Sequence, residues 1–585
     1  MKQILCDVLI IGSGGAGLRA AIEAAGHGSV VLVSKGPVGR SGATILAGAD
    51  IMADGASLNR LGFPDDPSDS PDDWARDIAI EGFDLNEQQL VQAYVAGAGD
   101  EIERLIHWGL TIRKTLPRAI LTTGPSICAS LRNGMRGHSD QITVIDNCMA
   151  LDLLTTGGHV AGALLLEATS GEFVTVQSKS TVIATGGWHQ AYAFNAGPDE
   201  ATGDGQAMAF RAGAELFDME MVTFAPNILL APPRHRGSLW FYILPGALLN
   251  SNGDAFLAWE DPKVAKLALT SEWNKLLFSK ASMREIMAGR GTTQGGVYFS
   301  MKHLPTNLFD ALEKEYGGWR FQGDDFSDLM SRMRQGYAAE VGPAAEYFEG
   351  GIRINARCET TLPGLYAAGE CTGGLFGANR VSAATTEMLV QGAIAGHEAA
   401  KAAAVGDPPA LDTVEVDTLV ANALAPLKRM RQTSVHELRT NLRDTAYRDV
   451  GVIRRGDRLQ DAITTLMDLE AAWDILGVDT SRRSQNKEWV EALELRNMIQ
   501  VVRASASAAL DRTESRGVHM REDHPITDNT AWRKHIVCRQ EGGKPSLTFA
   551  KVDSGHDVES EIVPYETAIV RAAAALDSSW GGGES

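Results

Sequence analysis

Cysteine is scarce in this sequence: the 585 residues include 6 cysteines, and no two of them stand in a CxxC pair. So few thiols do not provide a disulfide framework, and unpaired cysteines are not the usual ligands of an iron–sulfur cluster or a structural zinc. We therefore expect a reduced, cytoplasmic protein with no metal centre of its own.

Long apolar runs and an excess of positive charge are also missing. No apolar stretch is long enough to span a bilayer, and the N-terminal MKQILCDVLIIGSGG has neither a cationic leader nor a small-residue cleavage site. The 54 Lys and Arg against 74 Asp and Glu give a net charge of −20, which argues against nucleic acid or an anionic membrane as the main partner. The sequence predicts neither nucleic-acid binding nor direct membrane insertion.

Glycine, in contrast, is abundant, with 61 residues that gather in clusters such as GSGGAG, ATGG and TGDG. The first cluster follows the apolar run DVLII and precedes the helical stretch LRAAIEAAGHG and a second strand, SVVLVSK. This is a GxGxxG motif in the strand–turn–helix–strand context that gives it meaning. Gly12 allows the tight turn, Gly14 lets the backbone approach a pyrophosphate and Gly17 lets the helix pack on the strand, while the helix N-terminus offers amide donors. The motif predicts a dinucleotide site.

The end of the second strand indicates which dinucleotide is favoured. Nicotinamide-binding loops usually place an acidic residue about 20 positions after the glycines, where it binds the ribose. Here the strand ends in Ser34 and Lys35, and the missing carboxylate favours a flavin-binding variant of the loop.

Five further segments extend the argument to nearly the whole chain. In order they read GPVGRSGATILAGAD, STVIATGGWH, ATGDGQAMAFRAGAEL, GGIRINARCETTLPGLYAAGECTGGLFGANRVSAATTEMLVQG and RTESRGVHMREDHP. Together they resemble the flavoprotein subunit of the succinate dehydrogenase/fumarate reductase family, which includes L-aspartate oxidase and, more distantly, the adenylylsulfate reductase α subunit. The segments keep the family's order, so the resemblance is specific for the family; it is not specific for a substrate.

The resemblance implies an α/β fold: an FAD-binding, Rossmann-like domain of the glutathione-reductase type, split by a capping α+β domain and followed by a C-terminal helical bundle. The expected boundaries are residues 1–230 and 343–405 for the FAD domain, 231–342 for the capping domain, 413–540 for the helical domain and 541–585 for a C-terminal extension. The residues themselves predict a β-hairpin that turns at Ser170-Gly171 and a helix that begins with the capping box Ser434-x-x-Glu437.

FAD is the cofactor that the resemblance implies. It places these residues at the cofactor: Gly12, Ser13, Gly14, Gly15, Ala16, Gly17, Ser34, Lys35, Arg40, Ser41, Gly42, Ala43, Ala184, Thr185, Gly186, Asp204, Glu370, Ser382 and Ala383. Glu370 would hydrogen-bond the ribityl chain, the alternative being a surface carboxylate, and Ser382 and its neighbours would offer amides to the pyrimidine edge of the flavin. Membrane-complex relatives link FAD to a histidine in RSHT; Gly42 stands in its place here, so the FAD should be non-covalent.

Arg380, in GANR, is the main candidate for substrate binding. In relatives that act on succinate or fumarate, arginines and histidines hold the two carboxylates, and an arginine in the cap delivers the proton. Arginine suits this task because its planar fork binds a carboxylate bidentately. Arg380 matches a clamp arginine of the family; the alternative is a structural salt bridge.

Other positions depart from the family pattern. The stretch that matches FHPTG reads FAPN at residues 224–227, Glu346 replaces the histidine of HYTMGG, and Lys280 replaces the proton-delivering arginine. Lysine can carry a proton but lacks the fork of arginine. We therefore expect that succinate and fumarate are not the substrates. Replacement binders could come from PRHRGSLWFY, which holds Arg234, His235, Arg236, Trp240 and Tyr242, although a solvated loop explains the same pattern.

Three functions remain open. The leading one is an FAD-dependent oxidoreductase that adds or removes two hydrogens next to a carboxylate or other anionic group, and its electron-transfer partner would be an iron–sulfur or ferredoxin-like subunit. Its catalytic residues would be Lys280, Arg380, Glu346 and His235. The second is an oxidase in the manner of L-aspartate oxidase, which uses dioxygen or fumarate. The third is a non-catalytic flavin-binding scaffold. Lys280 and Ala225 favour it, because they stand where the family has catalytic or substrate-binding residues.

Overall fold

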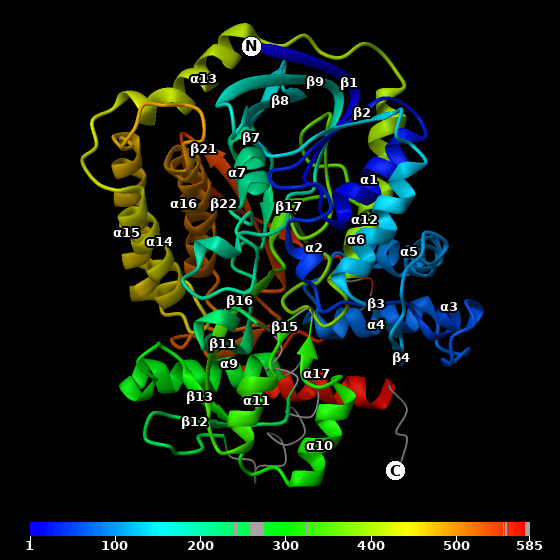
Figure 1. Cartoon of the computed structure of the whole chain (residues 1–585), viewed down its shortest axis with the longest axis vertical. Coiled ribbons are helices and arrows are strands. Elements are labelled where there is room, and N and C mark those ends of the chain that lie inside the picture. The colour runs from blue at the N-terminus through cyan, green and yellow to red at the C-terminus, as the bar shows by residue number, and fades with distance from the viewer. Residues whose placement is uncertain (239–243, 258–273, 322–323, 554, 556–557, 580–585) are drawn as a thin grey trace.

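The computed structural model describes residues 1–579 except 239–243, 258–273, 322–323, 554 and 556–557 (Figure 1). A seven-stranded sheet forms the centre of the larger part of the molecule. Its strands are β1 (Lys2–Ile11), β2 (Val30–Val33), β6 (Ile142–Ile145), β7 (Cys148–Thr156), β8 (His159–Glu167), β9 (Glu172–Ile183) and β18 (Leu365–Ala367).

The spatial order of this sheet is β6–β2–β1–β9–β8–β7. The first four strands are parallel, β8 and β7 continue antiparallel, and β18 runs parallel beside the end of β9 that β8 does not reach. The last four residues of β1 and all four of β2 are buried, as expected for parallel strands covered by helices on both faces. The predicted hairpin is confirmed, since β8 and β9 pair on either side of Ser170-Gly171.

Helices cover this sheet and connect its strands. They are α1 (Gly15–Ala25), α2 (Ala43–Leu46), α3 (Gly55–Arg60), α4 (Pro71–Glu81), α5 (Gln88–His107), α6 (Gly124–Arg136), η1 (His189–Ala191), α7 (Asp204–Ala212) and α12 (Ala384–Ala403), and a small sheet of β3 (Asp50–Met52), β5 (Ala119–Leu121) and β4 (Lys114–Leu116) lies among them. α12 approaches α1 closely because it presents glycines there: a Cβ on Gly396 would lie 2.4 Å from the Ala20 carbonyl oxygen.

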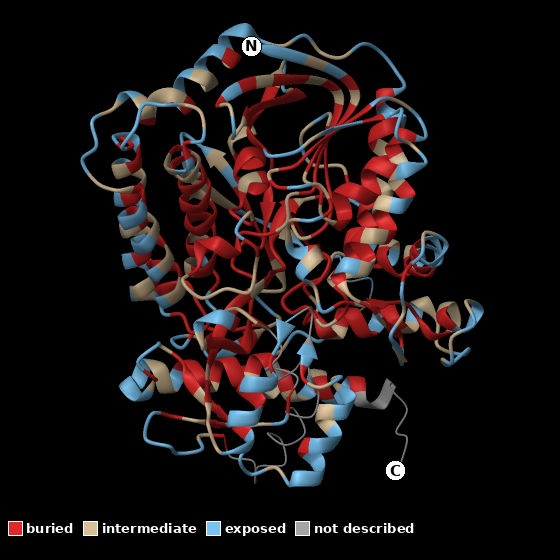
Figure 2. Cartoon of the chain, in the orientation of Figure 1, coloured by how far each residue is buried: buried red, intermediate tan, exposed pale blue. Residues whose placement is uncertain are grey.

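The segment after α12 is helical: α13 (Thr413–Lys428), α14 (Val435–Asp449), α15 (Gly456–Asp474) and α16 (Lys487–Asp511). The predicted capping box is confirmed, since the side chains of Ser434 and Glu437 accept each other's backbone amides at 3.0 and 3.1 Å. α16 lies in the interior, whereas the outer face of α15 is exposed (Figure 2). The helices α14, α15 and α16 lie on the opposite side of the molecule from α1, α6 and α12 (Figure 1).

The chain then returns to the part built around the seven-stranded sheet, which is expected to bind FAD and which we call the FAD part. The sequence analysis did not predict this return. A five-stranded sheet has the order β19 (Thr372–Gly373), β17 (Gly351–Arg353), β10 (Leu216–Phe217), β21 (Lys534–Glu541) and β22 (Lys544–Lys551). The expected boundary at residue 540 therefore falls inside β21, which pairs antiparallel with β10. β20 (Ile526–Asp528), which precedes β21, pairs with β23 (Ile562–Pro564), and β23 leads into α17 (Tyr565–Ser579).

A second lobe, which we call the inserted lobe, lies between the strands β11 (Val222–Ala231) and β16 (Ala339–Phe348). Its antiparallel sheet has the order β11–β16–β13–β12, with β13 (Val297–Ser300) and β12 (Ala247–Leu249). Its other described elements are η2 (Pro233–His235), α9 (Asn274–Glu285), η4 (Ile286–Arg290), α10 (Thr306–Glu315), β14 (Arg320–Phe321), β15 (Asp324–Asp325) and α11 (Ser327–Arg334). The lobe has a hydrophobic core of its own and forms the lower part of Figure 1.

β11 and β16 carry the chain between the two lobes. Their pairing is interrupted by register shifts, and Ala231 pairs with Glu340 at the outer end. The expected boundary at residue 343 lies in the middle of β16, so one strand contributes both to the core of the inserted lobe and to the centre of the FAD part. No helix in the described part of the chain is long and apolar enough to cross a membrane.

Candidate functional site

A cavity of about 250 Å³ lies over the loop between β1 and α1. Its wall brings together most of the predicted cofactor residues, from segments far apart in the sequence: Gly12, Ser13, Gly14, Gly15, Ala16, Ser34, Lys35, Ser41, Gly42, Ala43, Ala184, Thr185, Gly186, Asp204 and Glu370. Thr185 has a buried hydroxyl that makes no hydrogen bond to any described residue. A buried hydroxyl without a partner is costly, so a polar ligand in the cavity would satisfy it.

The three motif glycines differ in what surrounds them. A Cβ on Gly12 would lie 2.1 Å from the Ala184 carbonyl oxygen, and one on Gly17 would lie 1.9 Å from that of Gly12. Both therefore serve close backbone packing. A Cβ on Gly14 would meet only the Thr44 hydroxyl, at 3.4 Å, so the space beside Gly14 belongs to the cavity.

Two helix N-termini converge on this cavity. The N-caps of α1 and α12 are Gly14 and Ala383, and neither has a side-chain cap. The first residues of both helices line the cavity wall. The Gly15 amide donates to the Thr44 hydroxyl at 2.9 Å, while the positive ends of the two helix dipoles favour an anionic or electron-rich ligand. The residues present thus fit the pyrophosphate of a dinucleotide.

Lys35 and Asp204 line the cavity but neutralise each other. The Lys35 ammonium lies 2.7 Å from Asp204 and 2.8 Å from Glu494, and these carboxylates outweigh burial and raise the pKa of Lys35. Asp204 also accepts a hydrogen bond from Asn497 at 2.8 Å. The pair ties the end of β2 to α7 and α16.

The remaining predicted cofactor residues lie outside the cavity wall. Gly17 is in the packing interface of α1, and Arg40 is exposed. The Ser382 hydroxyl, fully buried, donates to Glu81 at 3.1 Å, and the Ala383 carbonyl accepts from Tyr94 at 3.0 Å. Both hold the start of α12 in place, while the next two residues of α12 reach the cavity.

Arg380 and Glu346 meet beside the cavity. Arg380 is 9% exposed, and its guanidinium donates to both carboxylate oxygens of Glu346 at 3.0 Å. Glu346 itself lines the cavity, and the ammonium of Lys275, on α9, lies 3.9 Å from it. Burial alone would raise the pKa of Glu346, but the positive charges of Arg380 and Lys275 hold it below its usual value. The carboxylate is therefore charged at neutral pH.

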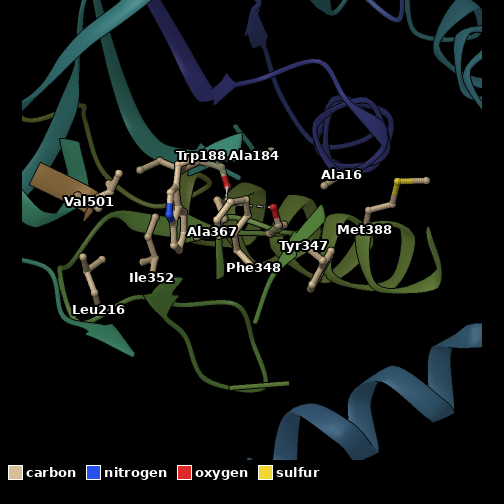
Figure 3. Close-up of a cluster of buried hydrophobic side chains, with 14 of the residues drawn as sticks. Ala16, Ala184, Trp188, Leu216, Tyr347, Phe348, Ile352, Ala367, Met388 and Val501 are labelled. Carbon is tan, nitrogen blue, oxygen red and sulfur yellow. Dashed lines mark hydrogen bonds between the residues drawn. The ribbon is translucent and has the colours of Figure 1, made fainter. Parts of the chain in front are cut away.

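Aromatic packing fixes this end of β16. Phe348 packs against Trp188, with ring centroids 3.9 Å apart, and both are fully buried (Figure 3). The Arg380 guanidinium lies over the Tyr347 ring, 4.6 Å from its centroid. His189, which directly follows Trp188, donates from its Nε2 to the Glu346 carbonyl oxygen at 2.9 Å, and burial lowers its pKa. The side chains of β16 thus have little freedom to rearrange.

Three further carboxyls lie near the pair: Glu349 and Glu387 are buried, and Glu370 is half-buried at the cavity wall. Burial raises the pKa of Glu370 to about 8, with a contribution from the charge of Glu346, and burial likewise raises the pKa of Glu387 to about 8. Burial also raises the pKa of Glu349, which hydrogen-bonds Thr223. Tyr347 donates its hydroxyl proton to Glu387. One carboxylate is charged next to Arg380, whereas Glu370 and Glu387 retain protons near neutral pH.

We expect Glu387→Gln to flatten the pH dependence of stability. Because the native pKa lies near 8 and the usual value is 4.5, the stability that the protonated group provides is complete below pH 4.5 and is lost as pH rises through 8. One such group changes the free energy of unfolding by up to about 1.4 kcal/mol per pH unit in that window. Urea unfolding of the wild type and the variant between pH 5 and 9 measures this. Glu398→Gln, on the same helix and paired with Arg357 at the surface, is the control; parallel profiles for wild type and Glu387→Gln would contradict the assignment.

The two other predicted catalytic residues lie away from the Arg380–Glu346 pair. The Lys280 ammonium donates a hydrogen bond to the Glu566 carboxylate of α17 at 2.8 Å and lies 5.2 Å from the centroid of the Tyr565 ring. His235 is buried against Phe326, with its Nδ1 3.9 Å from Asp324. Trp240 and Tyr242 lie outside the described residues.

Some residues of the site were missed in the sequence. His189 and Tyr347 line the cavity, and each stands next to a motif residue, which was a usable signal. Glu387 lies in the quoted segment that contains Arg380. Lys275 has no motif around it, and only the fold brings it to Glu346.

Comparison with known proteins agrees with this geometry. Residues 7–386 match the FAD binding domain family, and residues 439–566 match the family described as fumarate reductase flavoprotein C-term. The A subunit of fumarate reductase (CoM/CoB) from Methanothermobacter marburgensis is 34% identical over 564 residues, which cover 92% of this chain and 97% of that protein. L-aspartate oxidase of Streptomyces coelicolor is 29% identical, with 92% of each chain covered. A solved structure of Mycobacterium smegmatis Sdh1 in complex with UQ1 superposes with a TM-score of 0.84 at 29% identity, over 94% of this chain and 95% of that one.

Proposed function

The chain belongs to the fumarate reductase/succinate dehydrogenase flavoprotein family of FAD-dependent oxidoreductases, and on that premise we propose that it transfers two electrons to or from a carboxylate or other small anionic substrate that is neither succinate nor fumarate. FAD, when bound, supplies the hydride chemistry. The residues of the chain bind the substrate, exclude water and donate or accept the protons.

The observation that carries this proposal is the Arg380–Glu346 pair at the cavity wall. A guanidinium beside a flavin site suits a substrate carboxylate, because its fork binds two oxygens. In this chain, however, one nitrogen of that guanidinium, Nη2, already donates to both carboxylate oxygens of Glu346. A dicarboxylate would have to displace Glu346 or accept its negative charge nearby, which supports a substrate other than succinate or fumarate.

Proton delivery is the second task of the site. Lys275 on α9 lies 3.9 Å from Glu346, whereas Lys280, on the same helix, is engaged with Glu566. We propose that Lys275 delivers the proton in the reaction. Lys280 can deliver it only after its ammonium has left the carboxylate of Glu566. His235 lines a neighbouring cavity instead.

Further parts of the proposal concern FAD attachment, the partner and location. Gly42 lines the cavity and has no side chain that could form a bond to flavin, which supports non-covalent FAD. The relative from Methanothermobacter is one subunit of a fumarate reductase, and this chain has no paired cysteines, so electrons would pass to a separate iron–sulfur or ferredoxin-like subunit. All six cysteines are buried and unpaired, which supports work in the cytoplasm.

The experiment is an anaerobic screen of the yellow protein. Candidate acids are added to the oxidised protein, and unsaturated acids to the dithionite-reduced protein, while flavin absorbance is followed. We expect succinate and fumarate to be inert and another acid to react at rates typical of enzymes, roughly 1 to 1,000 per second. Turnover of succinate or fumarate in that range would contradict the proposal that the substrate is another acid. If no acid reacts with the flavin, the result would favour a non-catalytic flavin-binding scaffold.

A second candidate function is an oxidase like L-aspartate oxidase. The observation that favours it is Glu346 itself, because a buried carboxylate beside Arg380 can receive the ammonium of an amino acid whose carboxylate meets the arginine. Rapid reoxidation of the reduced flavin by dioxygen, together with reduction by an amino acid, separates this function from the first.

A further inference from the structure

A second, larger cavity of about 480 Å³ adjoins the first, and we call it the basic cavity. The two cavities share the wall residues Leu46, Ala196 and Gly197. The volume lies in the range of sites for metabolite-sized ligands. The basic cavity is formed by the loop before α7, the segment after β11 and helix α14, so it lies where the FAD part, the inserted lobe and the helical segment meet.

Three arginines line the basic cavity: Arg234, Arg236 and Arg443. Among the described residues, none of the three lies within 4 Å of a carboxylate oxygen, although Asp199 and Asp324 are also in the wall. Three such cations are unusual in a chain with a net charge of −20, where most arginines have an acidic partner. Arg234 and Arg236 are exposed and Arg443 is half-buried, and three arginines against the two aspartates give the wall one net positive charge. A positive concave surface attracts and binds anions.

Two of these arginines are held in position. The Arg236 guanidinium lies over the Phe194 ring, 5.2 Å from its centroid, and Arg443 donates to the carbonyl oxygens of Tyr192 and Ala193 at 3.2 and 3.4 Å. Burial, with the neighbouring charges of Arg439 and Arg236, lowers the pKa of Arg443. The positive charges of these arginines therefore repel one another, and a bound anion would reduce this repulsion.

We propose that the basic cavity binds a doubly charged oxyanion of the substrate, a phosphate ester or a polycarboxylate, while the reacting part of the same molecule reaches the FAD cavity through the shared wall. This inference rests on the proposed function and names the class of its substrate. It follows from two observations together: Arg380 is occupied by Glu346, and the arginines without a carboxylate partner lie one cavity away. The substrate would thus be larger than succinate and anchored at a distance from its reacting carbon.

The test uses the FAD-loaded full chain and three probes: inorganic phosphate, pyrophosphate and citrate. Calorimetry measures binding of the probe. A change in flavin absorbance shows that the bound probe alters the surroundings of the flavin in the adjoining cavity. We expect pyrophosphate or citrate to saturate a single site. The preferred probe shows whether the natural group is a phosphate or a set of carboxylates.

Variants decide where the probe binds. Arg234→Gln combined with Arg236→Gln is expected to weaken binding at least tenfold, because charge-assisted contacts are lost, with FAD content and reduction by dithionite unchanged. The control is Arg448→Gln on α14, an exposed arginine paired with Asp449, which should bind the probe like the wild type. Absence of saturable binding, or equal binding by the double variant, would overturn the basic cavity as an anion site. If in that case a small acid still exchanged hydrogen with the flavin, the proposed function would stand without this inference.

Discussion

Gly14→Val is expected to give a folded protein that holds no FAD. A Cβ at this position meets only the Thr44 hydroxyl, at 3.4 Å, so the apoprotein can accommodate the side chain. The branched valine would instead fill the space beside the α1 N-terminus, where the pyrophosphate must approach the backbone. The measurement is the flavin-to-protein ratio after purification, together with the circular dichroism spectrum and the melting temperature in the absence of FAD.

Gly17→Val is the matched comparison, because its Cβ would lie 1.9 Å from the Gly12 carbonyl oxygen. This variant should fail to fold rather than fail to bind. Stoichiometric FAD in Gly14→Val would show that the loop does not contact the cofactor. Acid precipitation of the wild type gives the reference value and should release all flavin into the supernatant; flavin that stays in the pellet would contradict non-covalent attachment.

Arg380→Gln is expected to cost about 3 to 5 kcal/mol of unfolding free energy, the range for a buried ion pair that loses one partner. It leaves the Glu346 carboxylate buried beside Lys275 alone. Replacing both residues, Arg380→Gln with Glu346→Gln, should recover much of this loss, because the Glu346 carboxylate is then no longer left without its guanidinium. Urea unfolding of the two single variants and the double variant gives the coupling energy directly.

The same variants separate a structural from a catalytic role. If Arg380 also binds the substrate, the double variant should be stable and hold FAD, yet react slowly with the substrate found in the screen. Glu346→Gln alone should bind small carboxylates more tightly than the wild type, because the guanidinium loses its internal partner. Normal substrate kinetics in a stable double variant would show that the pair serves the fold only.

The local features of the fold could be predicted because each rests on neighbouring residues. The motif from Gly12 to Gly17 and the capping box of Ser434 and Glu437 are contained within a few positions, and the structure has both. The strand β21 was missed although its signal was present: a β-branched run, HIVC, precedes Gly542-Gly543, where both glycines have positive φ and β22 turns back.

The partners of the charged residues could not be predicted, because they come from distant positions. Nothing near Lys35 indicates that Glu494 will lie 2.8 Å away, and nothing near Arg380 indicates Glu346 as its partner. The choice between two lysines of α9 shows the same limit. Lys275 and Lys280 are five residues apart, which turns them about 140° from each other on a helix of 3.6 residues per turn. A motif can therefore identify the position that matches a relative, but not the direction in which the side chain points.

The pairing of Ala231 with Glu340 has a consequence for how such a protein can change over evolutionary time. Cross-strand partners in an antiparallel ladder have Cα atoms about 4.5 to 5.5 Å apart, so the whole inserted lobe leaves and rejoins the chain at almost one point. Residues within it can be added, deleted or replaced while the two strands at its base keep their register, and the lobe's separate hydrophobic core can change with them. The larger part of the chain, which lines the FAD cavity, can thus keep its fold while the sequence of the inserted lobe changes.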